Sequence, residues 1–402
     1  MLAIGFAILL GVIAGSQPKA ADAVPANPAT NRLPVYDLKI VPAEWAKLER
    51  DPYSDQRHPA KLVVGGKEYS VAVRYRGEWA RSWPKKPLKV FLEKGQNLDG
   101  LQVLNLNSNW RDPSFIREQL AYQIYAACGV PAPRTRMVKL LVNGQFHGVF
   151  LEVEQPAKAF LERSKLPGAT IYKASSHEWG SDQRDLGSEL AYHAHYEKEN
   201  HKDQDYRDLQ GFCHDLATTR NAGSFFTNQV ALEEYINYLA ATALVQNWDC
   251  FNKNHFLIHD TAGSKRWLVV PWDLDRTLGD HWHGSFDEAR LPLQIGTSAL
   301  QGPTGWNHLM ESFFKDPGLR ARLLNRLEFL LQNEFTKEKL FPLVDRLESE
   351  ARADARLDRL RWSTQGVADI HEGIAGLKRF IEERRAFLLG EIKAQRAGEA
   401  GR

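Results

Sequence analysis

The chain has 402 residues, of which 43% are hydrophobic and 10% aromatic, so it can bury a large core as one big domain or two lobes. Its 52 Lys and Arg residues oppose 50 Asp and Glu residues, which leaves a formal net charge of +2 at pH 7. This balance excludes a general attraction to nucleic acid or to an anionic membrane, so any basic site must be local.

Residues 1–23 have the pattern of a secretory signal peptide, in which about a dozen apolar residues precede a small-residue cleavage site. The cleavage site is Ala21-Asp22-Ala23, and a Pro- and Ala-rich linker follows at 24–33. A short buried helix or an uncleaved anchor is the alternative interpretation. No later apolar run approaches the roughly 20 residues of a spanning helix, so we expect an exported protein (periplasmic, secreted or at the cell surface) without stable membrane insertion.

Three cysteines are present, and their spacing matches no zinc motif. At most one disulfide can form among Cys128, Cys213 and Cys250, so the fold does not depend on a disulfide framework.

Residues 34–173 predict an antiparallel sheet that carries one main helix. Two alternating runs flank Gly65-Gly66 and two more flank Asn143-Gly144, which predicts two hairpins, and "PLKVFLE" predicts a further strand between them. The helix is predicted over 114–128, where apolar residues recur at helical spacing before Gly129.

Residues 174–402 predict a mostly helical second lobe. The polar stretch 178–212 indicates a solvated insertion, with a substrate-facing lid as the less favoured alternative. A largely apolar helix then leads into two short strands at 255–260 and 266–273. A loop follows at 281–305, and residues 306–397 have a helical pattern.

The stretch "RWLVVPWDLDRTLGD" places two aspartates at the end of a strand, where they could hold a metal or form a phosphoenzyme. Asp273, Asp275 and Thr277 match the D-x-D-x-T signature of phosphatases that use the first Asp as nucleophile. That signature belongs to the first strand of a parallel α/β domain, and no alternating strands and helices follow here. The phosphatase hypothesis is therefore the weaker one. His281 and His283 suggest a mixed His/Asp metal site of a hydrolase, although exposed loop residues are the commoner explanation.

An upstream pair offers the alternative, because Asp249 and Asn254 have the Asp-x4-Asn spacing of a kinase catalytic loop. Alone, either residue is more often a helix cap or turn residue. An antiparallel pair of strands follows and ends at Asp273, so we expect Asp249, Asn254, Asp273 and Asp275 to converge. Such a set of oxygen ligands suits Mg²⁺, which neutralises the charge of a triphosphate.

A kinase also needs cations on the phosphates, and the segment 74–89 supplies several. Lys89 lies in the middle of a predicted strand on a partly apolar face, where an unpaired charge is costly, and Glu118 of the following helix is its expected partner. Lys86 is the alternative phosphate ligand. Glu152 and Glu154 fall where the chain leaves the first lobe, so either could contact the ribose or pair with an Arg.

These segments resemble the CotH (spore-coat protein H) kinases, a family of secreted or surface-associated atypical protein kinases. The resemblance runs from about residue 73 to residue 279, through "RYRGEWARSWPKKPLKVFL", "NGQFHGVFLEVEQP", "IYK", "NWDCFNKNHFLI" and "PWDLDRTLG". It implies a two-lobed, protein-kinase-like α+β fold, ATP with Mg²⁺ or Mn²⁺, and phosphate transfer to Ser or Thr of protein substrates.

By matching motif positions, the resemblance implies Asp249 as the catalytic Asp and Asn254, Asp273 and Asp275 as metal-site residues. Lys86 or Lys89 would hold the phosphates, with Arg76 and Ser82 in the loop above them. We therefore predict a first lobe at 34–173 and a second at 174–402 that carries the catalytic and metal loops within 247–280. A nucleotide-binding pseudokinase and a structural coat protein remain alternatives to an active enzyme.

Overall fold

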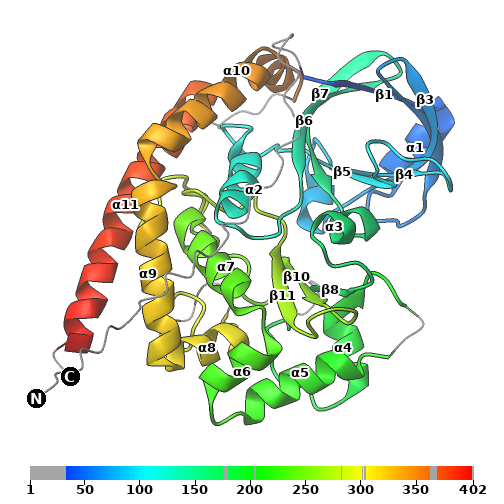
Figure 1. The fold of residues 1–402 in the computed structure, drawn as a ribbon. Coiled ribbons are helices and arrows are strands. Elements are labelled where there is room, and N and C mark those ends of the chain that lie inside the picture. The colour runs from blue at the N-terminus through cyan, green and yellow to red at the C-terminus, as the bar shows by residue number, and fades with distance from the viewer. Residues whose placement is uncertain are drawn as a thin grey trace, which may run out of the picture.

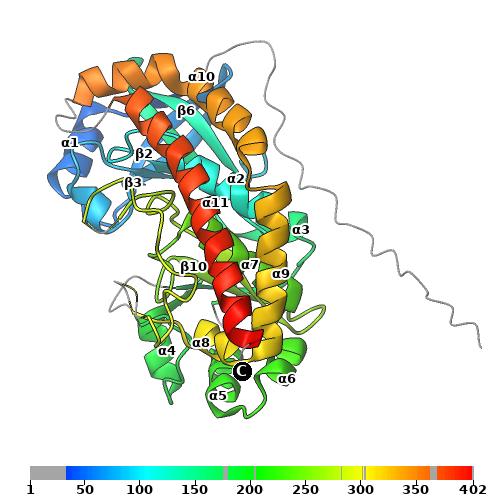
Figure 2. The same ribbon diagram turned by 90° about the vertical axis from the view of Figure 1, so that its left-hand side faces the viewer.

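The computed structural model describes residues 33–174, 180–202, 205–281, 283–300, 302, 305–362 and 369–400 (Figures 1 and 2). The predicted signal peptide and all but the last residue of the predicted linker lie outside these ranges. Within them, no helix is both long enough and apolar enough to span a membrane.

The first part of the chain forms a closed barrel of seven strands with the order β1-β2-β3-β4-β5-β7-β6. The barrel lies at the upper right of Figure 1. Its neighbouring strands pair antiparallel, except that β1 pairs parallel with β6 and so closes the barrel. The strands are β1 (Val35–Lys39), β2 (His58–Val64), β3 (Lys67–Tyr75), β4 (Leu88–Leu92), β5 (Val103–Asn107), β6 (Thr135–Val142) and β7 (Gln145–Glu154).

Alternation along the strands and two tight turns explain the local structure of the barrel. In β3 and β4 every second residue is buried, and these residues join an apolar cluster with Leu38, Leu62 and Leu106. Gly65, Gly66, Asn143 and Gly144 all have positive φ, as two-residue hairpin turns require. Both predicted hairpins are therefore present as β2–β3 and β6–β7.

The predicted fold class is nevertheless wrong. We expected a two-lobed, protein-kinase-like fold with an antiparallel first-lobe sheet, one main helix and a mostly helical second lobe. The sheet instead closes into a barrel through β1 and β6, and the rest of the chain carries a second, four-stranded sheet. The closure pairs residues 35–38 with 139–142, and no local sequence pattern reports a contact over that separation.

The second sheet has the order β11-β10-β8-β9 and lies below the barrel in Figure 1. Its strands are β8 (Thr170–Ala174), β9 (Tyr196–Lys198), β10 (His255–His259) and β11 (Trp267–Pro271). The α-helices are α1 (Pro42–Arg50), α2 (Arg117–Ala127), α3 (Lys158–Arg163), α4 (Glu189–His195), α5 (Arg207–Thr218), α6 (Ala222–Gln229), α7 (Leu232–Val245), α8 (His308–Lys315), α9 (Pro317–Asn333), α10 (Lys337–Trp362) and α11 (Ile370–Ala400).

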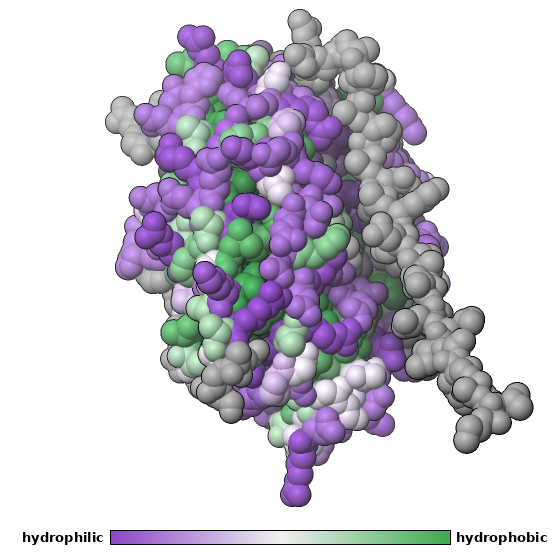
Figure 3. Space-filling view, turned by 60° about the vertical axis from the view of Figure 1, so that its left-hand side comes forward, coloured by the Kyte–Doolittle hydropathy of each residue, from purple (hydrophilic) through white to green (hydrophobic). Residues whose placement is uncertain are grey.

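The long C-terminal helices pack on the barrel and on α7, and α7 in turn packs on β11 of the second sheet. α10 packs on barrel strand β7 and on α11, and α9 and α11 flank α7 (Figure 2). One apolar core runs continuously from α2 and the outer face of the barrel through α7 to α11. The face in Figure 3 is mainly hydrophilic, with a band of hydrophobic residues down its middle.

The segment 178–212 is not the solvated insertion that its polarity suggested. Where the structure describes this segment, it forms α4, β9 and the start of α5, and three tyrosines, Tyr192, Tyr196 and Tyr206, are buried in the main core. Ser181 and Gln183 are also buried. A few aromatic side chains supply enough apolar area to anchor a segment that is otherwise polar.

Cys128, Cys213 and Cys250 are all buried free thiols.

Candidate active site

The loop between α7 and β10 carries Asp249 and Asn254. α7 ends at Gln246, which adopts a left-handed conformation and turns the chain. The side-chain amide of Asn254 donates hydrogen bonds to the carboxylate and to the backbone carbonyl of Asp249, each at 3.0 Å. The ammonium of Lys253 lies 3.1 Å from the other carboxylate oxygen. Asp249 is therefore held in one orientation by its own loop.

The β10–β11 hairpin brings this loop beside the Asp273 turn. His255 pairs with Pro271 in the ladder, and the amide of Trp272 donates to the carbonyl of Asn254 at 3.2 Å. Asn254 and Asp273 both have left-handed φ values, of 57° and 56°. Such a conformation is uncommon for a residue with a side chain and persists where the surroundings enforce it. The backbone amide of Asp273 donates a hydrogen bond to the Tyr122 hydroxyl of α2 at 3.1 Å, and this contact helps to hold its conformation.

Five acidic side chains gather here, and we call them the carboxylate cluster: Asp249, Asp273, Asp275, Asp280 and Glu118. Burial, followed by the charges of Asp273 and Glu118, raises the pKa of Asp275 well above its usual value. Burial likewise raises the pKa of Asp249 to about 6, that of Asp280 to about 7 and that of Glu118 to about 8. The negative charges of the cluster therefore repel one another, and a cation would relieve that repulsion.

The carboxylates of the cluster are not arranged as a closed, protein-built metal cage. Within the described ranges, no three His, Cys, Asp or Glu side chains lie close enough together to hold an ion. Among the hydrogen bonds and ion pairs of those residues, none involves the carboxylate of Asp273 or Asp275. The Asn254 amide nitrogen is engaged with Asp249.

Arg76 lies on the barrel side of the site, and Lys89 of β4 is near Arg76. The Arg76 guanidinium donates to the side-chain oxygen of Asn107, whose nitrogen donates to both oxygens of Glu118 at 2.8 and 2.9 Å. Arg76 also lies 5.6 Å from the centre of the Trp272 ring, next to Asp273. Burial, and then the charge of Arg76, lower the pKa of Lys89 to about 8.

The predicted ion pair between Lys89 and Glu118 is not among the salt bridges of the described residues. Glu118 is linked to Arg76 through Asn107 instead. Lys89 rather shares its electrostatic environment with Arg74 and Lys173, and Glu199 is the acid that opposes them.

The other three predicted nucleotide contacts are engaged away from the cluster. The Lys86 ammonium lies 3.8 Å from Glu49 of α1 and 5.6 Å from the Tyr75 ring. The Ser82 hydroxyl donates to the carbonyl of Trp79 at 2.7 Å in an exposed 3₁₀ turn (Trp79–Ser82). Glu154 is buried, where it accepts from the Arg134 amide and pairs with Arg163 at 2.5 Å. Of the open alternatives for Glu154, the pairing with an Arg is thus present.

Sequence reasoning missed three members of this site: Asn107, Tyr122 and Asp280. Asn107 ends the strand "VLNLN", and a polar residue at the end of an apolar strand could have marked it. Asp280 ends the stretch "RWLVVPWDLDRTLGD" and forms an ion pair with Arg276 at 2.8 Å. Tyr122 lies inside an apolar helix and gave no separate signal.

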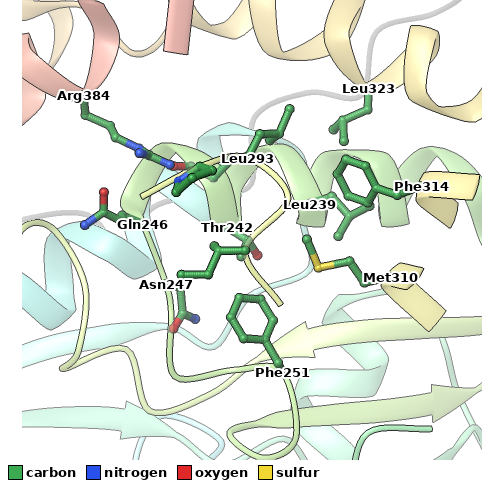
Figure 4. Close-up of a pocket in the computed structure, with 13 residues that line it drawn as sticks. Leu239, Thr242, Gln246, Asn247, Phe251, Leu293, Met310, Phe314, Leu323 and Arg384 are labelled. Atoms are coloured by element: carbon green, nitrogen blue, oxygen red, sulfur yellow. The ribbon is translucent and has the colours of Figure 1, made fainter. Parts of the chain in front are cut away.

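Two small cavities lie behind the loop and not at the carboxylate cluster. Both are lined by Leu239, Thr242, Phe251 and Met310, and Figure 4 shows one of them between α7, α8 and the loop. Neither offers room for more than about a water molecule or two, so neither can hold a nucleotide.

Comparisons with known proteins agree on one family. The family described as CotH kinase protein matches residues 73–388. The inner spore coat protein H of Bacillus subtilis (strain 168) is 27% identical over 322 residues, which are 78% of this chain and 85% of that protein. An inner spore coat protein H-like protein of the same organism is 41% identical over 64 residues, 15% of this chain and 21% of that protein.

Among solved structures, the Helicobacter pylori proinflammatory kinase CtkA matches with a TM-score of 0.35 and 9% identity, over 78% of this chain and 95% of that one. A TM-score of 0.35 is too low to show a shared fold.

Proposed function

Because this chain belongs to the CotH kinase protein family, we propose that it transfers the γ-phosphoryl group of ATP to Ser or Thr hydroxyls of a protein, with Mg²⁺ or Mn²⁺ as the ion. The observation that carries the proposal is the Asp249–Asn254 pair beside Asp273 and Asp275, with Arg76 linked through Asn107 to Glu118 of the same cluster.

In the proposed reaction, the acceptor hydroxyl oxygen forms a bond to the γ-phosphorus while the bond from that phosphorus to the β,γ-bridging oxygen breaks. ADP leaves with the electron pair, and Asp249 takes the hydroxyl proton. Because burial raises the pKa of Asp249 to about 6, its carboxylate is mostly ionised at pH 7 and still basic enough to accept a proton. The Asn254 amide and the Lys253 ammonium keep the carboxylate in place during this step.

Charge neutralisation is the other requirement of phosphoryl transfer. Asn254, Asp273 and Asp275 would hold the ion, which supplies positive charge to the triphosphate when it is bound. Lys89 and Arg76 would contact the phosphate oxygens from the barrel side. These residues bind and orient the substrate, and positioning of this kind is the main source of rate enhancement in such reactions.

Incubation of the full chain with γ-labelled ATP, Mg²⁺ and a generic Ser/Thr-rich acceptor protein tests the proposal. We expect label on Ser or Thr with the wild type and none with Asp249→Asn or Asp273→Asn, which keep shape and remove charge. Binding of ATP without transfer would indicate a pseudokinase, and absence of both would favour a structural role like that implied by the name of the spore coat relative. Either result contradicts the proposal.

The D-x-D-x-T phosphatase is less favoured. Asp273 follows β11, which pairs antiparallel with β10, whereas that chemistry uses a parallel sheet. Label trapped on Asp273 itself, unaffected by Asp249→Asn, is the result that would support it.

We also propose that the protein is exported and cleaved after Ala23. N-terminal sequencing of protein recovered outside the cytoplasm should read from Val24. Recovery of the chain with an intact N-terminus, inside the cytoplasm alone, would contradict this.

A further inference from the structure

The four backbone carbonyls between Asp249 and Asn254 each accept a hydrogen bond from outside that stretch. The Nδ1 atom of His255 lies 3.1 Å from the carbonyl of residue 250 and 2.8 Å from that of residue 253. The side-chain amide of Asn307 donates to the carbonyl of residue 251 at 2.7 Å, and the Ser181 amide donates to that of residue 252 at 3.1 Å. The loop backbone therefore has its acceptors satisfied from three separate parts of the chain.

The direction of these hydrogen bonds is determined. Carbonyl oxygens only accept, so Nδ1 of His255 must carry its hydrogen. Its Nε2 is then an acceptor, and the Gln183 side-chain nitrogen donates to it at 2.8 Å. The Gln183 oxygen accepts in turn from Asn307, and the Asn307 oxygen caps α8 by accepting from the Met310 amide at 2.9 Å.

This network is sealed from solvent. The exposed fractions of Gln183, His255 and Asn307 are 2%, 2% and 8%. In such surroundings an unpaired polar group is costly, so the satisfied network favours one arrangement strongly over others. The apolar side of the loop is packed as well, because Phe251 lines the cavity in Figure 4 and lies against Gly296, where a Cβ would be 2.3 Å from its ring.

We propose that His255, Gln183 and Asn307 are positioning residues that hold the 249–254 loop, and so fix the Asp249–Asn254 pair, without touching the substrate. This inference rests on the proposed function for its consequence on catalysis. The left-handed conformation of Asn254 is consistent with it, because such a conformation needs enforcement from its surroundings. The residues come from three distant parts of the sequence, and one of them, Gln183, lies in a segment whose composition suggests a solvated insertion.

Two substitutions of His255 separate positioning from general packing. In His255→Asn the amide nitrogen can replace Nδ1 and still donate to the loop carbonyls, whereas in His255→Gln the amide reaches only the Gln183 side. We expect kcat within about threefold of the wild type for His255→Asn and about 10- to 100-fold lower for His255→Gln, with KM for ATP changed less than about threefold in both. Equal losses in the two variants, or losses in KM alone, would overturn the proposal.

If the His255 variants do not fold, a second pair of variants, Asn307→Ser and Asn221→Ser, tests the proposal. Asn307→Ser keeps the cap of α8 but leaves the carbonyl of residue 251 and the Gln183 oxygen without a donor, so kcat should fall about tenfold or more when measured well below the lowered thermal unfolding midpoint. Asn221→Ser, at the cap of α6, is the matched control, because that cap has no contact with the loop. Wild-type kcat in Asn307→Ser, or an equal loss in the control, would contradict the inference.

Hydrogen exchange separates this inference from the proposed function. Peptides that span 249–254 should exchange faster in His255→Gln and Asn307→Ser than in the wild type and His255→Asn, whether or not the protein transfers phosphate. Absence of transfer by the wild type would refute the function alone. Unchanged exchange in all variants would refute the positioning network.

Discussion

The side-chain amide of Asn254 donates to both the carboxylate and the backbone carbonyl of Asp249, so the two residues act as one unit. The sequence spacing Asp-x4-Asn does not require this contact. It arises because the loop folds back on itself and Asn254 takes a left-handed conformation.

Replacement of Asn254 by Asp should change the pH dependence of activity. A second carboxylate beside Asp249 raises its pKa further above about 6, so the acid limb of kcat should move to higher pH, and kcat at pH 7 should fall about tenfold or more. The measurement is kcat from pH 5 to 8. Asn254→Ala removes the amide without adding charge, so it should shift the acid limb of the kcat profile less than Asn254→Asp does. An acid limb at the wild-type pH in Asn254→Asp would contradict this account.

Lys89, and not Lys86, should support nucleotide binding. Lys89 lies beside Arg76 with its pKa lowered to about 8, whereas the Lys86 ammonium lies 3.8 Å from the Glu49 carboxylate. We expect Lys89→Met to weaken ATP binding by about tenfold or more, and Lys86→Met by less than about threefold, in calorimetric titrations at low salt. Wild-type binding should also weaken above pH 8, as Lys89 loses its proton. If Lys86→Met weakened ATP binding more than Lys89→Met did, Lys89 would not be the main phosphate ligand.

Glu118 should make the metal-free protein less stable as the pH rises. Burial raises its folded-state pKa to about 8, above the value of about 4.5 expected in the unfolded chain, so the folded state holds the extra proton between these values. Stability contributed by this proton is fully present below pH 4.5 and is lost as the pH rises toward 8. Glu118→Gln stays neutral, so at pH 8 it should be more stable than the wild type by on the order of 4 kcal/mol, and at pH 5 within about 1 kcal/mol of it.

Urea unfolding at the two pH values measures this difference. Addition of Mg²⁺ with ATP should reduce it, because a bound cation offsets the repulsion within the carboxylate cluster. A difference that does not change with pH would show that Glu118 is ionised in the fold throughout.

Lys85 should stabilise the fold and take no part in catalysis. Its ammonium is fully buried, donates to the carbonyl of Val149 and lies 2.5 Å from Asp358 of α10, whose carboxylate also accepts from the Val149 amide. Lys85→Met leaves that carboxylate buried with one partner and should cost about 3–5 kcal/mol in unfolding free energy. The double variant Lys85→Met/Asp358→Leu should recover part of the loss in a double-mutant cycle. Additive losses would show that the pair does not couple α10 to the barrel.

Local sequence patterns were sufficient for the elements around the site. The turns at Gly65-Gly66 and Asn143-Gly144, the helix that carries Glu118 and the two strands that precede Asp273 follow from residue types within a few positions of each other. The order of Asp249, Asn254, Asp273 and Asp275 likewise indicated their shared chemistry, because a hairpin brings its own ends together.

Distant contacts could not be predicted in this way. The Lys89–Glu118 pair was a reasonable guess from strand alternation, but Asn107 lies between Glu118 and Arg76, and which cation it contacts depends on how β3, β5 and α2 pack. The network of Gln183, His255 and Asn307 depends in the same way on three segments that meet only in the folded core.

The sequence by itself determined the strands, the hairpins, the family and the set of oxygen-bearing residues, because each of these is encoded within short stretches of chain. Only the tertiary structure decided that the first sheet closes into a barrel, that Lys85 and Lys86 are engaged away from the site, and that the 249–254 loop is held from behind. The physical reason is that closure of a barrel and satisfaction of buried polar groups depend on contacts between residues tens to hundreds of positions apart, which compete globally and leave no periodic trace in the sequence.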